Sequence, residues 1–183
     1  MSNCHEYIRP AYSSETGVIT SLYVNYLKEL SPYDDAIPKN DKEIKHMAKE
    51  MVIEYAESSH TTIYVIVKTE IIGFFVVGQW PQAYATDDVY IMQFYISKPY
   101  QRKGYGKTAV KLFTESTEFY NLTDDISLFV LFGNPASYFW TKIFKELGYK
   151  DLVKTGKIAP PTEENMDELP NARFYYFSAR EGV

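Results

Sequence analysis

The sequence predicts a mixed α/β (α+β) fold in which a central, mostly antiparallel sheet of about seven strands is flanked by about four helices. Three observations predict this class. Two segments with helical spacing of apolar residues come first, a pair of β-rich runs with a tight connection follows, and one strand–helix–strand segment lies over 89–132. Because only that last segment can form a parallel crossover, we expect the other strand pairs to be antiparallel.

The first third of the chain is predicted to contain one short strand and two helices. A strand candidate over 5–11 precedes Ser14, which opens a helix that stops at Ser31. A second helix covers about 41–56. Both helices carry their apolar residues on one face, as helices that pack against a sheet do.

The middle of the chain changes to strand-like patterns. The runs "TTIYVIV" (61–67) and "IIGFFVV" (71–77) are joined by a three-residue turn, which indicates an antiparallel hairpin. "VYIMQFYI" (89–96) is a third long strand and "ISLFVLF" (126–132) is a fourth, with a helix between them.

The last third of the chain is predicted to hold one helix and two strands. The helix covers 134–149 and ends at Gly148, a residue type that is common just beyond helix ends. Strand candidates lie at about 149–155 and 173–179, and the segment between them has the composition of a long exposed loop.

Length and composition limit the class of protein. A chain of 183 residues with 45% hydrophobic content suits a single domain, which we expect over 1–183. Its only cysteine is Cys4, which excludes an intramolecular disulfide and fits a reducing compartment. The N-terminus lacks the pattern of a secretion signal, and no segment approaches the roughly 18 consecutive apolar residues of a membrane span. We therefore expect a cytoplasmic protein without a membrane partner.

The charge of the chain argues against nucleic acid as a partner. The net charge is −5, whereas nucleic-acid binding needs a basic surface. Acidic residues come in pairs, which are Asp34-Asp35, Asp87-Asp88, Asp124-Asp125 and Glu163-Glu164. These pairs favour a cationic or amine-bearing partner. The alternative is that they are solvated turn residues.

The stretch "ISKPYQRKGYGKTAV" (96–110) matches more than one phosphate-binding pattern. The segment 104–109 fits the dinucleotide pattern G-x-G-x-x-G/A, and 106–108 has the tail of a P-loop, G-x-x-x-x-G-K-[ST]. A third possibility is the pyrophosphate loop of an acyl-CoA-dependent transferase. An ordinary helix start that happens to contain glycine is the alternative without a ligand.

The first two patterns fit poorly. A dinucleotide fold places its first glycine directly at the end of the strand, whereas "SKPYQRK" separates Ile96 from Gly104. A P-loop needs a glycine five positions before Gly106, and that position is Gln101.

The third pattern fits position by position. "QRKGYG" (101–106) resembles the Q/R-x-x-G-x-G/A loop of the GCN5-related N-acetyltransferase (GNAT) family. "ELSPY" (29–33), "QFYISKPYQRKGYGKTAVKLF" (93–113) and "NPASYFW" (134–140) are similar to a bacterial subgroup of these transferases. A helix start suits a diphosphate because its first N–H groups have no acceptor within the helix, and glycine permits a close approach.

The resemblance implies the GNAT fold, with a V-shaped splay between the strands 89–96 and 126–132 that receives the pantetheine arm of acetyl-CoA. It implies a diphosphate site in the loop 101–107 and a pantetheine contact from Asn134, which can also cap the following helix. The coenzyme-binding residues predicted in this way are Phe94, Tyr95, Ile96, Gln101, Arg102, Lys103, Gly104, Tyr105, Gly106, Lys107 and Asn134.

The catalytic residues that the resemblance implies match the family's residue types less well than the coenzyme-binding residues do. The glutamate that often serves as the base in the family is matched by Gln93, which cannot take a proton. The family's tyrosine acid has Tyr138 as its nearest phenol. Asp88 is a candidate base, as are Asp34 and Asp35.

The resemblance implies an enzyme that transfers an acetyl group from its cosubstrate acetyl-CoA to an amine of a small molecule or protein, directly in a ternary complex. Aromatic and acidic residues of the acceptor side suit a cationic amine. These are Tyr26, Tyr33, Trp80, Tyr84 and two of the aspartate pairs. No metal is expected, because the spacing Glu43-x-x-His46 has no second copy, and a homodimer is compatible with these features. The alternative is a non-catalytic acyl-CoA-binding module or sensor with the same fold.

Overall fold

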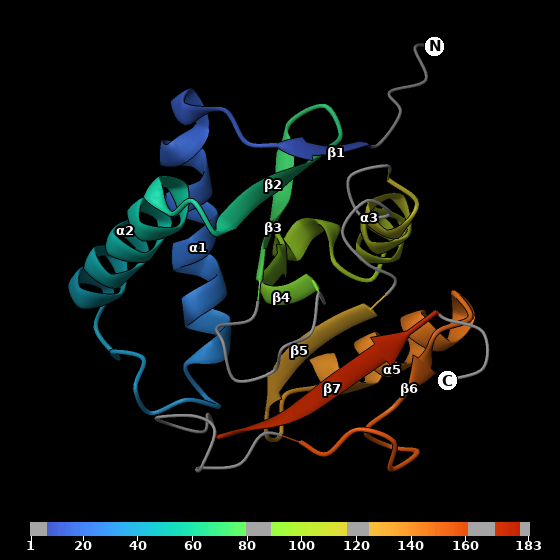
Figure 1. The fold of residues 1–183 in the computed structure, drawn as a ribbon. Coiled ribbons are helices and arrows are strands. Elements are labelled where there is room, and N and C mark those ends of the chain that lie inside the picture. The colour runs from blue at the N-terminus through green and yellow to red at the C-terminus, as the bar shows by residue number, and fades with distance from the viewer. Residues whose placement is uncertain (1–6, 80–88, 117–124, 161–170, 180–183) are drawn as a thin grey trace. The chain divides into compact units, whose positions relative to one another are not determined.

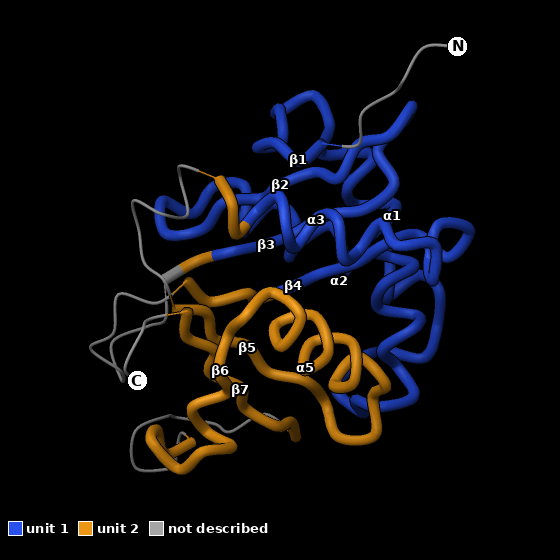
Figure 2. The backbone as a smooth tube through the Cα atoms, turned by 90° about the vertical axis from the view of Figure 1, so that its right-hand side faces the viewer, with its two compact units in different colours: residues 1–77, 93–113 blue, residues 78–92, 114–183 orange. Residues whose placement is uncertain are grey.

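The computed structural model describes residues 7–79, 89–116, 125–160 and 171–179. The chain forms two compact units (Figure 2). Unit 1 contains residues 1–77 and 93–113, and unit 2 contains residues 78–92 and 114–183. The boundary between the units passes through two strands, β3 (Ile71–Gln79) and β4 (Val89–Ile96), and through the last residue of the helix α3 (Tyr105–Thr114). The expected single domain over 1–183 stays a prediction.

Seven strands form one open sheet in the order β1-β2-β3-β4-β5-β7-β6. Besides β4 they are β1 (Tyr7–Pro10), β2 (Thr61–Val67), β3 (Ile71–Gln79), β5 (Asp125–Leu131), β6 (Lys150–Asp151) and β7 (Ala172–Ser178). The pairs β1–β2, β5–β7 and β6–β7 are antiparallel, whereas β4 and β5 are parallel. The predicted class, a mostly antiparallel mixed sheet with helices, is confirmed.

Four α-helices and two short 3-10 helices accompany the sheet in the described residues. They are η1 (Ser13–Glu15), α1 (Thr16–Leu30), α2 (Asp41–Glu57), η2 (Lys98–Tyr100), α3 (Tyr105–Thr114) and α5 (Ala136–Glu146). The predicted ends of the first two helices are confirmed closely. The Asn40 side chain caps α2 by accepting a hydrogen bond from the Glu43 N–H at 2.9 Å.

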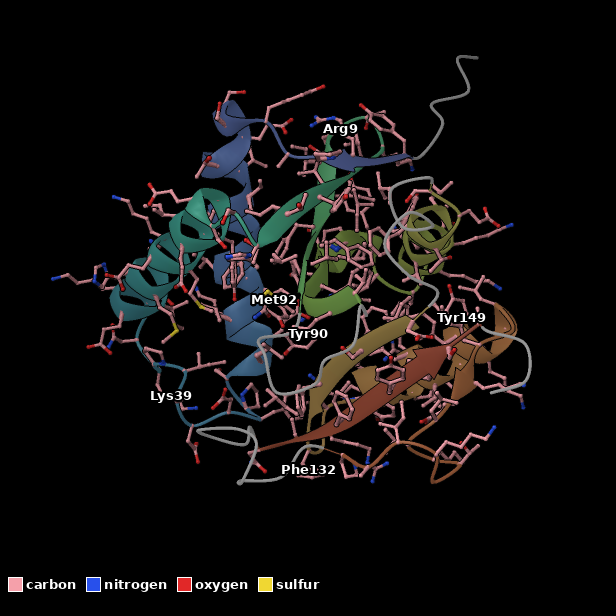
Figure 3. All side chains as sticks on the ribbon, viewed as in Figure 1. Arg9, Lys39, Tyr90, Met92, Phe132 and Tyr149 are labelled. Carbon is pink, nitrogen blue, oxygen red and sulfur yellow. The ribbon has the colours of Figure 1, made fainter. Side chains whose placement is uncertain are left out.

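The start of α1 is fixed by an ion pair between β1 and η1. The Glu15 carboxylate accepts hydrogen bonds from the Arg9 guanidinium, at 2.8 and 2.5 Å, and from the Tyr12 N–H at 2.8 Å. Hydrogen bonding to Arg9 is the main cause that lowers the pKa of Glu15 to about 2. Figure 3 shows Arg9 on β1, next to the loop that leads into α1.

In unit 1, neighbouring residues of β3 bind helices on opposite faces of the sheet. Tyr23 of α1 stacks on Phe74, with ring centroids 5.3 Å apart, and Phe113 of α3 stacks on Phe75 at 5.2 Å. Successive side chains of a strand point to opposite faces, so α1 and α3 cover different sides of β3 (Figure 1). α1 and α2 pack side by side on the same side.

In unit 2, α5 packs on β7. The rings of Phe144 and Phe177 stack with centroids 4.3 Å apart. Gly148 ends the helix in the left-handed conformation, with φ +85°, as predicted. Its N–H donates to the carbonyl of Lys145, and the Tyr149 N–H donates to that of Phe144 at 2.9 Å, which is the paired bonding of a Schellman motif.

The predicted strand over 149–155 was too long. Only Lys150–Asp151 pairs with β7, because the chain turns directly afterwards. The Asp151 side chain accepts a hydrogen bond from the Lys154 N–H at 3.0 Å, and Gly156 has φ +72°. A side chain that bonds to the backbone a few residues on favours a turn over a strand.

The parallel pairing of β4 and β5 joins Val89–Ile91 to Ile126–Leu128, all within unit 2. This confirms the strand–helix–strand crossover predicted over 89–132. The predicted V-shaped splay beyond these pairs concerns residues of different units and stays a prediction. In the part of the chain that the structure describes, no helix has the length and apolar character needed to cross a bilayer.

Gly73 of β3 is required by a close backbone approach. A Cβ atom there would overlap the carbonyl oxygen of Tyr95 and come within 3.0 Å of the Ile96 side chain. We expect Gly73→Ala to lower the free energy of unfolding by about 1–3 kcal/mol in a urea titration, because two strands must separate to admit the methyl group.

The matched control is Gly17→Ala in α1, where an added Cβ meets nothing within 4 Å. Alanine is the better helix former, so this variant is expected to gain up to about 1 kcal/mol. A Gly73→Ala protein as stable as the Gly17→Ala protein would contradict the close approach.

Candidate functional site

The loop after β4 makes a sharp reversal into α3. Arg102 and Gly104 both lie in the left-handed region, with φ +57° and +91°. This conformation explains the glycine at 104, since a residue with a Cβ is strained there. An added Cβ at Gly104 would meet nothing within 4 Å, so the space beside this part of the loop is open.

The start of α3 presents main-chain donors. The first bond of the helix runs from the Thr108 N–H to the Gly104 carbonyl, at 3.0 Å. Among the described residues, no protein acceptor binds the N–H groups of Gly104, Tyr105 and Gly106. Such donors and the helix dipole favour an anion. The exposed side chains of Arg102, Lys103 and Lys107 add positive charge to this part of the loop.

The side chain of Gln101 supports the loop through two hydrogen bonds. Its Nε2 donates to Glu29 Oε2 at 3.0 Å and to the Ile96 carbonyl at 2.9 Å. The other carboxylate oxygen of Glu29 accepts a hydrogen bond from the Tyr95 hydroxyl, at 2.9 Å. Burial, and then Glu29, raises the pKa of Tyr95. The amide of Gln101 is therefore engaged within unit 1.

The hairpin between β2 and β3 also supports the loop. The Lys68 ammonium donates to the Tyr105 hydroxyl at 2.5 Å, and the Tyr100 hydroxyl donates to Glu70 at 2.7 Å. The supporting roles of Glu29, Lys68 and Glu70 could not be predicted from the sequence, because each side chain forms its hydrogen bond with a residue tens of positions away.

The main chain of β4 offers its groups alternately to its two sides. The Ser97 N–H donates to the Ile72 carbonyl of β3 at 2.8 Å, and the Tyr95 carbonyl faces Gly73. By alternation, the main-chain groups of Phe94 and Ile96 point away from β3. The predicted backbone contacts of Phe94, Tyr95 and Ile96 with the coenzyme stay predictions.

Gln93, at the position of the expected base, contacts a buried phenol. Its Nε2 donates to the Tyr55 hydroxyl at 3.2 Å. Burial is the main cause that raises the pKa of Tyr55, so this hydroxyl stays protonated at neutral pH. The pair is neutral and supplies no base.

In unit 2, Pro135 is the N-cap of α5, and Asn134 bonds to the main chain just beyond it. Its Oδ1 accepts a hydrogen bond from the Ala136 N–H at 2.9 Å, at the start of α5. No hydrogen bond of the Asn134 Nδ2 group occurs among the described residues, so this donor can serve a ligand. Tyr138 is 70% exposed on α5, with the Lys142 ammonium 5.9 Å from its ring centroid.

The remaining candidates are outside the described residues or on the surface. Asp88, together with Trp80 and Tyr84, lies outside the described residues. Asp34 accepts a hydrogen bond from the Ala36 N–H at 2.9 Å, and Asp35 lies 3.8 Å from Lys39. These contacts are those of solvated turn residues, the alternative considered above.

Glu43 and His46 do not belong to a cluster of three or more possible metal ligands in the described part of the chain. His46 contacts the exposed Glu50 at 3.2 Å. The described part of the chain contains no group of three or more side chains that could hold a metal ion.

Comparison with solved structures places this fold among acetyltransferases. A histone acetyltransferase HPA2 and related acetyltransferase from Corynebacterium glutamicum has a TM-score of 0.63 at 16% identity, covering 97% of this chain and 99% of its own. PaiA N-acetyltransferase from Thermoplasma acidophilum, solved with coenzyme A, has 0.60 at 11%, with 94% and 98% covered. Spermidine N-acetyltransferase from Vibrio cholerae, solved with coenzyme A and spermine, has 0.59 at 16%, with 96% and 95% covered.

No curated protein sequence matches this chain. The model of the acetyltransferase (GNAT) family, in contrast, matches residues 24–149, which is more than half of the chain and includes β4, the glycine loop and α5. The chain belongs to the GNAT acetyltransferase family.

Proposed function

We propose that this protein transfers the acetyl group of acetyl-CoA to an amine nitrogen, directly in a ternary complex. The observation that carries this proposal is the loop 101–107, whose main-chain donors at the start of α3 have no protein acceptor among the described residues. We also propose that both units belong to one GNAT domain, since the family match takes in residues of each, and that the protein is cytoplasmic.

The loop fits a diphosphate in geometry and in charge. The space beside Gly104 is open, the donors of Gly104, Tyr105 and Gly106 are close in sequence, and cationic side chains flank them. Each unit also offers a donor of the kind that binds an amide carbonyl of a pantetheine arm, namely the N–H group of Ile96 in unit 1 and the Nδ2 group of Asn134 in unit 2. Two solved relatives of the same fold hold coenzyme A, which supports this choice of donor.

The reaction forms a bond from the amine nitrogen to the acetyl carbonyl carbon and breaks the bond from that carbon to sulfur. The amine loses one proton and the thiolate gains one. Orientation and a donor near the developing oxyanion contribute most to such a reaction. Because Gln93 and Tyr55 form a neutral pair, we propose that the amine proton leaves to water or to a more distant acid such as Asp88. Tyr138 remains the candidate proton donor to the thiolate.

The second candidate function is an acyl-CoA-binding module without turnover. The engagement of Gln93 with Tyr55, in place of a carboxylate, favours it. Release of free thiol from acetyl-CoA across a panel of amines separates the two candidates, because only the enzyme releases thiol in an amine-dependent way.

Gly106→Glu is expected to abolish acetyl-CoA binding while the chain still folds. The carboxylate would stand at the diphosphate site, whereas glutamate in the first turn of a helix is otherwise favourable. For the unaltered protein, acetyl-CoA at about 100 times its Kd is expected to stabilise the folded state by about 2.7 kcal/mol, seen as a raised Tm.

Gly106→Ala is the control, since it removes the glycine without adding charge. It should keep most of the Tm rise that acetyl-CoA causes. An unchanged acetyl-CoA affinity of the Gly106→Glu protein in calorimetry would place the diphosphate elsewhere.

Glu29→Gln is expected to raise the Kd for acetyl-CoA about tenfold by loosening the loop. Hydrogen bonds to a charged group contribute about 1.5–3 kcal/mol each, and Glu29 accepts two of them. Calorimetry gives the Kd, and hydrogen exchange of peptides spanning 97–104 should become faster.

Glu57→Gln, an exposed change at the end of α2, is the matched control and should alter neither quantity. Equal behaviour of the two variants would show that Glu29 does not hold the loop.

The pH dependence of the transfer tests the missing base. An alkyl amine has a pKa near 10, so its neutral fraction grows about tenfold per pH unit below that value. The rate constant for total amine should therefore climb until about pH 9. Gln93→Glu should move the rise to lower pH, because it places a base beside the Tyr55 hydroxyl.

Gln93→Met, which removes the amide without adding a base, should leave the position of the rise unchanged. A rate constant that reaches a plateau near neutral pH in the unaltered protein would contradict the absence of a base and indicate a base other than those named here.

A further inference from the structure

Unit 2 contains a hollow at the carboxyl end of β5, which takes in one residue of the proposed coenzyme site and several that have no role there. Its volume is about 250 Å³, and its walls include Phe132, Asn134, Ser137, Arg173 and Tyr175. These residues come from the end of β5, the start of α5 and the start of β7. Figure 3 shows Phe132 at this end of the β5–β7 pair, with Tyr149 at the other end.

The face of β7 explains why an arginine reaches the hollow. Residues 173, 175 and 177 share one face of the strand. Phe177 and Tyr175 are buried and stack at 5.8 Å, with Phe177 against α5. Arg173 pairs with Val130 across the strands, at the end of β5, and is exposed.

Arg173 supplies the charge of this hollow. Among the described residues that line the hollow it is the only charged one, and no ion pair of Arg173 occurs in this part of the chain. The N-terminus of α5 contributes little, since its first donors are satisfied. The N–H groups of Ala136 and Tyr138 donate to Asn134 Oδ1 at 2.9 Å and to the Pro135 carbonyl at 3.1 Å.

We propose that this hollow binds the carboxylate of the acetyl acceptor, and that the acceptor is a small amino carboxylic acid. One guanidinium matches a carboxylate in charge and can bind it with two parallel hydrogen bonds. A phosphate monoester, with a charge of about −1.5 to −2, would be left partly uncompensated.

The size and the position of the hollow support the same acceptor. Its volume lies below the roughly 300–1,000 Å³ of pockets for drug-sized ligands, so it suits a group of amino-acid size. The rings of Phe132 and Tyr175 offer an apolar wall for a side chain. Asn134 lines the hollow and is also the proposed pantetheine contact, so this inference rests on the proposed function.

Matched pairs of acceptors test the proposal in the full chain with acetyl-CoA. The pairs are L-lysine with cadaverine and L-phenylalanine with phenethylamine, each differing only in the carboxylate. We expect a higher kcat/KM for the amino acids. Arg173→Gln should lower their kcat/KM about tenfold more than that of the amines, and Arg173→Lys should lie between. Comparing variants on the same pair cancels the difference in amine pKa.

Lys154→Gln is the control, because it removes an exposed cation of unit 2 that does not line the hollow. It should leave the preference unchanged. Turnover of the amines with no preference for the amino acids, or a preference that Arg173→Gln does not reduce, would overturn the inference while the proposed function stands.

A binding measurement keeps the test independent of turnover. In calorimetry with coenzyme A present, N-acetylglycine should bind and N-methylacetamide, which lacks the carboxylate, should not. Arg173→Gln should remove the difference. If these results hold but no amine is acetylated, the proposed function fails and the carboxylate site remains. If N-acetylglycine binds no better than N-methylacetamide, the carboxylate site is refuted.

Discussion

The conformation of the loop 101–107 depends on two hydrogen bonds that the Glu29 carboxylate accepts. This carboxylate lies near the end of α1 and accepts hydrogen bonds from the Tyr95 hydroxyl of β4 and from Gln101 of the loop. Gln101 in turn holds the Ile96 carbonyl. One acidic group thus ties together the helix, the end of the strand and the loop, and the main-chain donors of α3 are presented because these parts are fixed.

The sequence predicted most of the elements because local signals were strong. Period-two and helical patterns placed β2, β4, α1 and α2 to within a residue or two. The glycine loop was recognisable since its spacing is short and local. The strand predicted over 149–155 failed because Asp151 turns the chain with its own side chain, a contact that competes with a strand of suitable composition. Sequence could not predict the roles of Glu29 or Arg173, which arise from tertiary proximity rather than from neighbouring residues.

The Gln93–Tyr55 pair shows why a family position does not by itself give a family role. Replacing a carboxylate by an amide keeps the shape of the side chain and removes its charge. The buried phenol of Tyr55, whose pKa is raised, suits a neutral partner because it also stays uncharged. A carboxylate at this position would instead accept a hydrogen bond from the Tyr55 hydroxyl, which is the arrangement that Gln93→Glu creates. The half-buried position 93 is therefore filled by a neutral amide. Under the proposed function, the proton acceptor of the reaction lies elsewhere.

The left-handed conformation of Arg102 has a consequence for how this loop balances stability against affinity. An L-residue other than glycine, asparagine or aspartate is disfavoured there by about 1–2 kcal/mol. A chain optimised for folding alone would carry glycine at this position, as it does two residues later. The sequence keeps a long cationic side chain at that cost, which agrees with the proposal that the loop binds an anion. Under that proposal, replacing Arg102 by glycine would stabilise the folded loop and weaken its binding of an anionic ligand.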